Sequence, residues 1–259
     1  MVLFLGSFPT NENIKDGMVQ RIQSIDSFFL DDERVYLSAS FRRFFKKKVV
    51  SAGHLTIVEC NALIHFLFIV ELFRSSTSVY IHSVFNVLPN ILPILFFYKK
   101  KYTLDVHGVV PEEFEMNGRP LFARIYSLAE KVIFSRAANI ICVTNAMRDY
   151  YAKKYTSEKN YIVYTILPQN LDGYNIKDMD KEESVNIIYS GNTQKWQNID
   201  LMCSLIKNNL RPHVKYTILT GDIANMHVFL KKYGLTEKTN IDIRSVMPSE
   251  LGQFYKKAH

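Results

Sequence analysis

The sequence lacks the patterns that mark several well-defined protein classes. Its three cysteines, Cys60, Cys142 and Cys203, lie far apart and form no CxxC pair, which argues against a zinc knuckle. Because all three lie in apolar surroundings, we expect buried free thiols and a reducing compartment, the cytoplasm. No complete GxGxxG or GxxxxGK[ST] pattern occurs, so neither a dinucleotide fingerprint nor a P-loop is predicted.

Long apolar runs are also missing. The most membrane-like segment, residues 62–73 (ALIHFLFIVELF), is too short to span a bilayer and is interrupted by His65 and Glu71. The N-terminus, MVLFLGSFP, lacks the basic region and the long apolar region of a signal peptide. We therefore predict a buried or interfacial helix at residues 62–73, and at most peripheral contact with a membrane.

Composition and charge leave room for several partners. With 259 residues, 47% of them apolar, the chain can form one large or two small globular domains. The net charge of +7 favours an anionic partner such as nucleic acid, an acidic membrane or a phosphorylated substrate, although a solvated basic surface explains it equally well. No nucleic-acid-binding signature accompanies the basic side chains, so nucleic acid is not the expected partner.

Predicted strands and helices alternate along the chain, which is typical of parallel βα units. We predict an N-terminal Rossmann-like domain at residues 1–168, a polar linker at 169–183 and a second Rossmann-like domain at 184–259. The second domain contains only three predicted strands, so we expect it to be incomplete at its C-terminus. The predicted strands are residues 2–5, 34–37, 78–83, 102–106, 139–143, 161–166, 185–189, 214–219 and 241–245.

The segment KKKYTLDVHGVVPEEFEMNGRP, residues 99–120, places a histidine and a glycine directly after a strand. In an open α/β sheet the carboxyl ends of the strands face the ligand crevice, so His107 is a candidate to bind a sugar hydroxyl. A structural histidine at a strand end is the alternative. His82, at the end of the preceding strand, and Glu113 are candidates for the same edge, although Glu113 also fits a solvated helix face.

The segment YSGNTQKWQNID, residues 189–200, has a strand, Gly191, a short loop with Lys195 and then a helix start. Backbone N–H groups and a lysine at such a position favour an anion, and a nucleotide diphosphate would fit. The alternative is an ordinary βα turn with a surface lysine. Gly221 in LTGDIANM repeats the pattern more weakly. No cluster of histidines and carboxylates has metal-site spacing, so no metal is predicted.

Two segments suit an anionic membrane surface. FRRFFKKK, residues 41–48, interleaves phenylalanines with bases, and VLPNILPILFFYKKK, residues 87–101, ends an apolar helix with three lysines. Together they could form a membrane-contact face. A core helix with a solvated lysine end is the alternative.

The order and spacing of these segments resemble the retaining glycosyltransferases of family 4. The resemblance covers nearly the whole chain, from DGMVQRI through YTLDVHGVVPEE, AANIICVTNAMRDYYAKKY and YIVYTILPQN to IIYSGNTQKWQNID, YTILTGD and VMPSELGQFYKKA. It implies the α/β GT-B fold, in which two Rossmann-like domains face a cleft. It also implies transfer with retention from a UDP- or GDP-linked sugar to a glycan or lipid-linked acceptor in surface polysaccharide biosynthesis, without a bound metal.

The resemblance also implies residue roles. His107 would lie near the transferred sugar as the catalytic residue, with Lys195 as the cation of the donor-phosphate loop. The implied donor-binding residues are Gly17, Gly191, Asn192, Lys195, Gly221, Val246 and Met247, and the implied acceptor-side residues are Asp16, His82 and Glu113.

Two departures from the family pattern put activity in doubt. Asn192 stands where the family usually has an arginine, and the chain ends before the family's paired glutamates. We therefore expect weak or no transfer from this chain. A truncated or non-catalytic GT-B binding protein and a GT-B nucleotide-sugar epimerase remain the alternatives.

Overall fold

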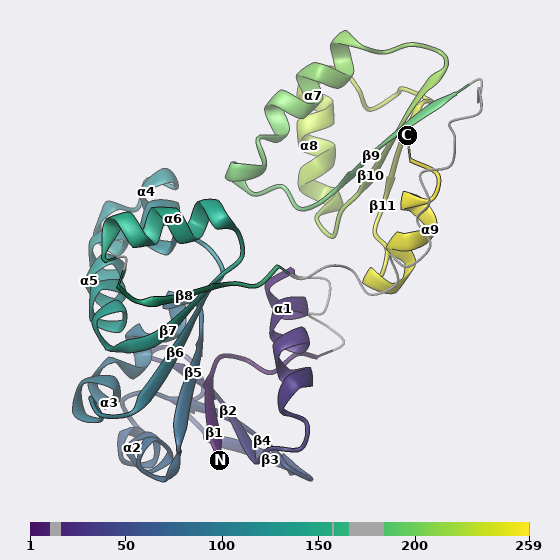
Figure 1. Cartoon of the computed structure of the whole chain (residues 1–259). Coiled ribbons are helices and arrows are strands. Elements are labelled where there is room, and N and C mark those ends of the chain that lie inside the picture. Colours follow the sequence, from purple (N-terminus) through teal and green to yellow (C-terminus); the bar gives the residue numbers. More distant parts are fainter. Residues whose placement is uncertain (11–16, 157, 166–183, 259) are drawn as a thin grey trace. The chain divides into compact units, whose positions relative to one another are not determined.

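The computed structural model describes residues 1–10, 17–156, 158–165 and 184–258. The chain divides into two compact units, Met1–Ile166 and Leu167–His259 (Figure 1). The predicted linker at 169–183 and Asp16 lie outside the described residues. Among the helices that the structure describes, none is both long and apolar enough to pass through a bilayer.

The N-terminal unit is built on an eight-stranded sheet with the strand order β3-β4-β2-β1-β5-β6-β7-β8. Every neighbouring pair is parallel except β3 with β4, which are antiparallel. A mostly parallel sheet was predicted, and the antiparallel pair was not. The strands are β1 (Val2–Leu5), β2 (Arg34–Ser40), β3 (Lys48–Ala52), β4 (Leu55–Asn61), β5 (Ser78–His82), β6 (Lys101–Val106), β7 (Ala137–Cys142) and β8 (Asn160–Val163).

Helices cover both faces of this sheet, with α1 on one face and α2, α3 and α5 on the other (Figure 1). This arrangement explains why the central strand β1 is a continuous apolar run, since both of its faces are out of water. Phe4 packs with Ile22 and Ile25 of α1, whereas Leu3 and Leu5 belong to the core on the opposite face. The helices are α1 (Gly17–Asp26), α2 (Phe66–Ser75), α3 (Ile91–Phe96), α4 (Val110–Met116), α5 (Pro120–Arg136) and α6 (Asn145–Lys154).

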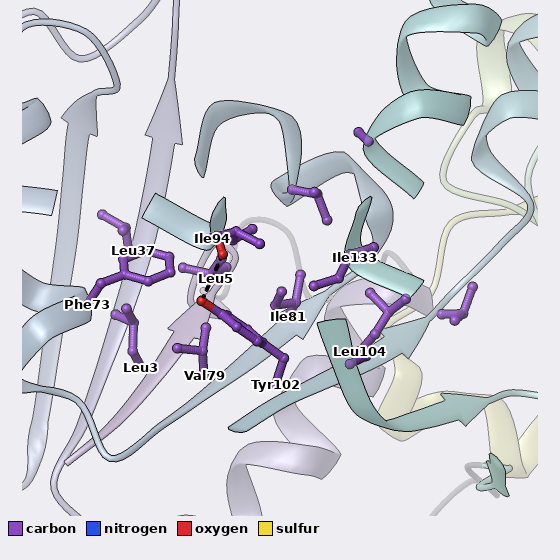
Figure 2. Packing of buried hydrophobic residues seen from close by; sticks show 14 of the residues in the cluster. Leu3, Leu5, Leu37, Phe73, Val79, Ile81, Ile94, Tyr102, Leu104 and Ile133 are labelled. Carbon is purple, nitrogen blue, oxygen red and sulfur yellow. Dashed lines mark hydrogen bonds between the residues drawn. The ribbon is translucent and has the colours of Figure 1, made fainter. Parts of the chain in front are cut away.

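The larger core cluster joins β1, β2, β5 and β6 to α2, α3 and α5 (Figure 2). Tyr102 of β6 is fully buried there, and its hydroxyl donates to the carbonyl of Phe97, 3.0 Å away. A buried tyrosine hydroxyl needs such a partner to offset its lost hydration. Cys60 and Cys142 are buried in the same cluster, and all three cysteines are free, as the sequence predicted.

Residues 87–98 do not form the single helix that the sequence predicts. The structure instead has a 3₁₀ turn, Leu88–Asn90, followed by the short helix α3. Pro89 and Pro93 explain the break, because proline cannot donate the backbone hydrogen bonds of a continuous helix. The helix predicted at residues 62–73 is also displaced, because α2 begins only at Phe66 and ends at Ser75.

The C-terminal unit contains a parallel sheet of three strands, β9 (Val185–Ser190), β10 (Val214–Leu219) and β11 (Ile241–Arg244), in the order β11-β10-β9. The described α-helices of this unit are α7 (Ile199–Asn208), α8 (Ile223–Tyr233) and α9 (Leu251–Tyr255). Its core contains Cys203, Met226 and Leu230, each nearly or fully buried. The three described strands and their parallel order agree with the sequence prediction.

Candidate functional site

A buried network of charges lies at the carboxyl ends of β5 and β6. Asp105 of β6 is fully buried, and its Oδ1 accepts hydrogen bonds from Nε and Nη2 of Arg21 at 2.9 and 2.6 Å. Its Oδ2 lies 3.1 Å from both Arg21 Nε and His107 Nε2. Arg21 Nη1 also donates to the carbonyl of Tyr164 at 2.7 Å. Arg21 therefore fixes α1 to the strand that positions His107.

This network determines the tautomer of His107. Burial alone would raise the pKa of Asp105, but the hydrogen bonds from His107 and Arg21 outweigh it and hold the pKa well below its usual range. An ionised carboxylate can only accept, so Nε2 of His107 carries a proton. Nδ1 of a neutral His107 is then an acceptor, and it is buried without a hydrogen-bond partner among the described residues. A hydroxyl group, such as that of a sugar, could donate the hydrogen bond that this nitrogen lacks.

His82 supports His107 from inside the unit. Its side chain is fully buried, and its ring meets that of His107 edge-on with centroids 5.6 Å apart. Its Nδ1 lies 3.7 Å from Asp105 Oδ2, which is beyond hydrogen-bond range. A β-carbon at Gly6 would lie 3.3 Å from that of His82, so Gly6 leaves room for the ring. Burial lowers the pKa of His82, with Asp105 opposing this effect, so His82 is neutral at pH 7.

His82, Asp105 and His107 have the chemistry of a metal site. One potential ligand atom from each lies within 4.8 Å of the others, the only such group of three in the described part of the chain. However, Arg21 donates to both oxygens of Asp105 and brings its own positive charge. A divalent cation would have to displace or repel that guanidinium. We therefore interpret the cluster as a hydrogen-bonded network that orients His107.

Glu113, a predicted site residue, lies in α4 beside this network. A β-carbon at Gly108 would collide with Glu113 Oε1, so the glycine gives the carboxyl its space. Burial raises the pKa of Glu113, and a backbone hydrogen bond at Val109 partly opposes that rise. The structure thus brings His82, His107 and Glu113 to one edge of the sheet.

A second buried carboxylate fixes the loop at Gly108 from the other side. Glu130 of α5 is fully buried and accepts from Lys154 Nζ at 2.7 Å and from the Tyr155 hydroxyl at 2.6 Å. The Tyr151 hydroxyl lies 3.1 Å from the carbonyl of Gly108 and 3.2 Å from Glu130 Oε2. Because these partners satisfy both oxygens of Glu130, the network holds α5, α6 and the Gly108 loop together.

In the C-terminal unit, the parallel strands bring the remaining candidates to one edge. Gly191 follows β9, Gly221 follows β10, and Val246 and Met247 follow β11. The side chain of Thr193 donates to Asp222, which joins the first two of these loops. The hydrogen bonds from Thr193 and Asn225 lower the pKa of Asp222. In this structure the backbone amide of Met247 donates to Glu250 Oε2 at 2.7 Å.

The loop after β9 has a defined conformation. The Tyr189 hydroxyl donates to the carbonyl of Asn192 at 2.6 Å, and a β-carbon at Gly191 would lie only 2.7 Å from that hydroxyl. The Asn192 amide donates to Gln194 Oε1, also at 2.6 Å. Lys195 begins a 3₁₀ turn, Lys195–Gln197, that leads into α7. Glycine at 191 therefore leaves space for the Tyr189 hydroxyl in this position, whereas a β-carbon at Gly221 would meet nothing within 4 Å.

The start of α7 depends on Asn198. Its φ of 50° and ψ of 52° place it in the left-handed region, which asparagine tolerates better than most residues. Its side chain also caps the helix by accepting from the amide of Leu201. Trp196, the only tryptophan, is 44% exposed in the turn before it.

Sequence reasoning missed four residues of these sites, Arg21, Asp105, Thr193 and Asp222. A signal for Asp105 was present, because a carboxylate inside an apolar strand requires a buried partner. Nothing in the sequence identifies Arg21 as that partner, since the two residues are 84 positions apart.

No model of a known protein family matches the chain, and no curated protein matches it in sequence. Solved structures do match it. Sucrose-phosphate synthase from Thermosynechococcus elongatus aligns with 99% of this chain and 73% of its own, at 12% identity and a TM-score of 0.64. HepE from Anabaena in complex with UDP aligns with 94% of this chain and 68% of its own, at 12% identity and a TM-score of 0.62.

A trehalose 6-phosphate synthase from Burkholderia multivorans gives a similar result. It aligns with 100% of this chain and 76% of its own, at 9% identity and a TM-score of 0.62. The two α/β units thus define a fold of the GT-B glycosyltransferase type, which confirms the predicted fold class. The aligned region spans about three quarters of the sucrose-phosphate synthase chain.

Proposed function

We propose that this chain is a glycosyltransferase of the hexosyltransferase type that takes a sugar from a nucleotide diphosphate. The observation that carries the proposal is the match of 99% of the chain to sucrose-phosphate synthase at a TM-score of 0.64. The match to HepE in complex with UDP supports a nucleotide-linked donor, and UDP is the first candidate, with GDP second. The buried free cysteines suit the reducing cytoplasm, where we place the reaction.

In this proposal the two units have separate tasks. The C-terminal unit binds the donor, with Lys195 and the loop amides after Gly191 stabilising the leaving diphosphate by preorganised charge. The N-terminal unit binds the acceptor, and acceptor binding must uncover the buried Nδ1 of His107 before this nitrogen can accept a hydrogen bond from a sugar hydroxyl. Asp105 and Arg21 hold His107 in the tautomer that leaves Nδ1 available.

The finer assignment follows the family 4 resemblance. We propose transfer with retention, without a resident metal, to a glycan or lipid-linked acceptor in surface polysaccharide synthesis. Gly17 at the start of α1 would lie near the donor phosphates and Glu113 on the acceptor side, whereas His82, predicted on the acceptor side, is fully buried and would act only through His107.

The test compares UDP binding by calorimetry in the wild type, Lys195→Ala and Lys207→Ala. Lys207, an exposed lysine in α7, is the matched control because its removal changes the net charge equally. We expect at least about a tenfold loss of UDP affinity in Lys195→Ala alone, as for a lost charge-assisted contact. Equal affinity in all three proteins would contradict the donor-loop assignment.

A non-catalytic nucleotide-binding protein is the second candidate. The observation in its favour is Asn192, whose amide is tied to Gln194 and supplies no positive charge beside Lys195. Incubation with UDP-sugars and mixed glycan acceptors separates the two candidates. Release of UDP that requires an acceptor supports the transferase, whereas UDP binding without release supports the binding protein.

A further inference from the structure

Exposed apolar and basic side chains gather in three neighbouring segments of the N-terminal unit. These segments are the loop 41–47 after β2, the turn and helix start at 62–67, and residues 92–98 in and after α3. We call their exposed side chains the basic-apolar patch. Its apolar members are Phe41, Phe45, Leu63, Ile64, Leu67, Leu92, Leu95, Phe96 and Tyr98, and its bases are Arg42, Arg43, Lys46 and Lys47.

A single buried amide holds the first two segments together. Asn61 Nδ2 donates to the carbonyls of Phe41 and Arg43 at 3.1 and 3.2 Å. Its Oδ1 accepts from the amides of Leu63 and Ile64 at 3.0 and 3.2 Å. Because Asn61 is almost fully buried, these four bonds fix the basic loop beside the apolar turn.

Aromatic contacts extend the patch to the third segment. Lys47 Nζ lies 3.9 Å from the ring centroid of Phe68 in α2. Phe66 of α2 meets Phe96 of α3 with ring centroids 6.4 Å apart, and the two helices lie side by side (Figure 1). The patch is therefore continuous across the three segments. Leu67, which belongs to the second of the three segments, is 81% exposed.

The charge of the patch is positive. Residues 41–50 contain no acidic side chain. Two nearby acids are engaged by bases outside the patch, since Glu59 lies 3.9 Å from Lys48 and Glu71 pairs with Arg74 at 2.8 Å. The four bases of the patch thus face solvent without a neutralising carboxylate in their own segment.

We propose that the basic-apolar patch docks this protein on a bilayer that contains anionic lipids. Leucine, isoleucine and phenylalanine side chains enter the interface between headgroups and acyl chains, while arginine and lysine contact the headgroup phosphates. The exposed leucines and Ile64 give a nucleic acid nothing to stack on, and they outnumber the four aromatic members of the patch, whose rings could stack on bases. The docking goes beyond the proposed sugar transfer and does not depend on it.

The fold links this surface to the candidate site. Strands β2, β4, β5 and β6 run parallel, so the residues that follow them lie at one edge of the sheet. The loop 41–47 and the turn 62–65 follow β2 and β4, and His107 follows β6. Docking through these two segments would therefore bring the His107 edge toward the bilayer, whereas Tyr98, which lies just before β6 and beside Arg136, is nearer the opposite edge of the sheet. Under the proposed function, the His107 edge could then receive a lipid-linked acceptor.

The test is cosedimentation of the full chain with two kinds of vesicle, phosphatidylcholine alone and phosphatidylcholine with one third phosphatidylglycerol. We expect binding only to the anionic vesicles, and weaker binding at high sodium chloride. The variant Arg42→Glu/Arg43→Glu/Lys46→Glu should bind at least about a hundredfold more weakly, since each base near the surface contributes about fivefold. The variant Leu63→Ser/Leu67→Ser should also bind more weakly.

Matched variants in the other unit control for charge and hydrophobicity. Lys207→Glu/Lys215→Glu/Lys238→Glu makes the same change in net charge, and Leu205→Ser/Val228→Ser removes two exposed apolar side chains. Both should bind vesicles as the wild type does. Because all substituted residues are exposed, circular dichroism should show every variant folded.

Four results would overturn the proposal. These are absence of binding to anionic vesicles, equal binding to neutral vesicles, an equal loss in both charge variants, and tighter binding of a labelled single-stranded oligonucleotide than of the vesicles. None of them bears on UDP binding, so docking and sugar transfer can fail separately.

Discussion

Arg21 of α1 and Asp105 of β6 form a two-pronged ion pair, with side chains 6% and 0% exposed. Neither residue is predicted to touch a substrate, yet together they determine which nitrogen of His107 carries a proton. The pair also joins the helix that follows the first strand to the strand that leads to the site. Its loss should therefore affect both folding and site geometry.

Removing Arg21 should be strongly destabilising. Arg21→Met leaves Asp105 buried without a cation, which we expect to lower the unfolding free energy by about 3–5 kcal/mol. Arg21→Met/Asp105→Leu should lose less, because it removes the stranded charge as well. Urea unfolding followed by far-UV circular dichroism measures both. Arg74→Met is the control, since its solvent-exposed pair with Glu71 should contribute little to stability.

Stability should fall when the pH drops below the ordinary histidine pKa. Burial lowers the pKa of His82 in the folded state, so the unfolded chain takes up the proton first. The contribution of His82 is therefore complete above about pH 6.5 and is lost as the pH falls through the folded pKa. Asp105, whose folded pKa is also lowered, adds a further loss only below about pH 4.

This dependence can be tested by urea unfolding at several pH values between about 7.5 and 5, which bracket the unperturbed histidine pKa. His82→Leu should flatten the change of unfolding free energy over that range. His213→Leu, at an exposed position, should keep the wild-type slope. If both variants show the same slope, His82 is not the titrating group.

Gly108→Ala should displace the Glu113 carboxyl group at a small cost. The added β-carbon would meet Glu113 Oε1, the far end of a flexible side chain, so we expect a loss of at most about 1 kcal/mol, the low end of overpacking. Gly108→Ala/Glu113→Ala should regain most of that loss. Gly221→Ala, whose β-carbon would meet nothing within 4 Å, is the control. An additive double variant in unfolding experiments would refute this packing relationship.

Replacing Asn198 by alanine should destabilise the protein more than replacing it by glycine. Alanine loses both the helix cap and the tolerance for a left-handed backbone, each worth about 1 kcal/mol. Glycine keeps the backbone freedom, so Asn198→Gly should cost only a few tenths of a kcal/mol. Thermal unfolding of the two variants gives the comparison. Equal midpoints would show that the φ of Asn198 is not a constraint.

The parallel strands were predictable because burial on both faces leaves continuous apolar runs. The prediction for β10 matches the structure at both ends, and that for β1 does as well. The β3–β4 hairpin was not predicted. Every residue of β3 is exposed, and an exposed strand does not need the continuous apolar run by which the buried strands were recognised. The β-branched residues on either side of Gly53, which has a φ of 56°, were the available signal.

The candidate site was predictable only in part. Strand order brings His82 and His107 to one edge, and this follows from a parallel sheet alone. The partnership of Arg21 with Asp105 depends on three-dimensional packing across 84 positions, which no local pattern encodes. The same is true of the Thr193–Asp222 contact between two loops of the C-terminal unit.

Trp196, half-exposed in the turn beside Lys195, gives this protein a built-in optical reporter. Because it is the only tryptophan in the chain, light absorbed at the red edge of the protein band excites a single indole. A nucleotide that approaches the turn would change the polarity around that indole and so its emission maximum. The loop that we assign to the donor can therefore be watched without a label, in the unmodified protein and in real time.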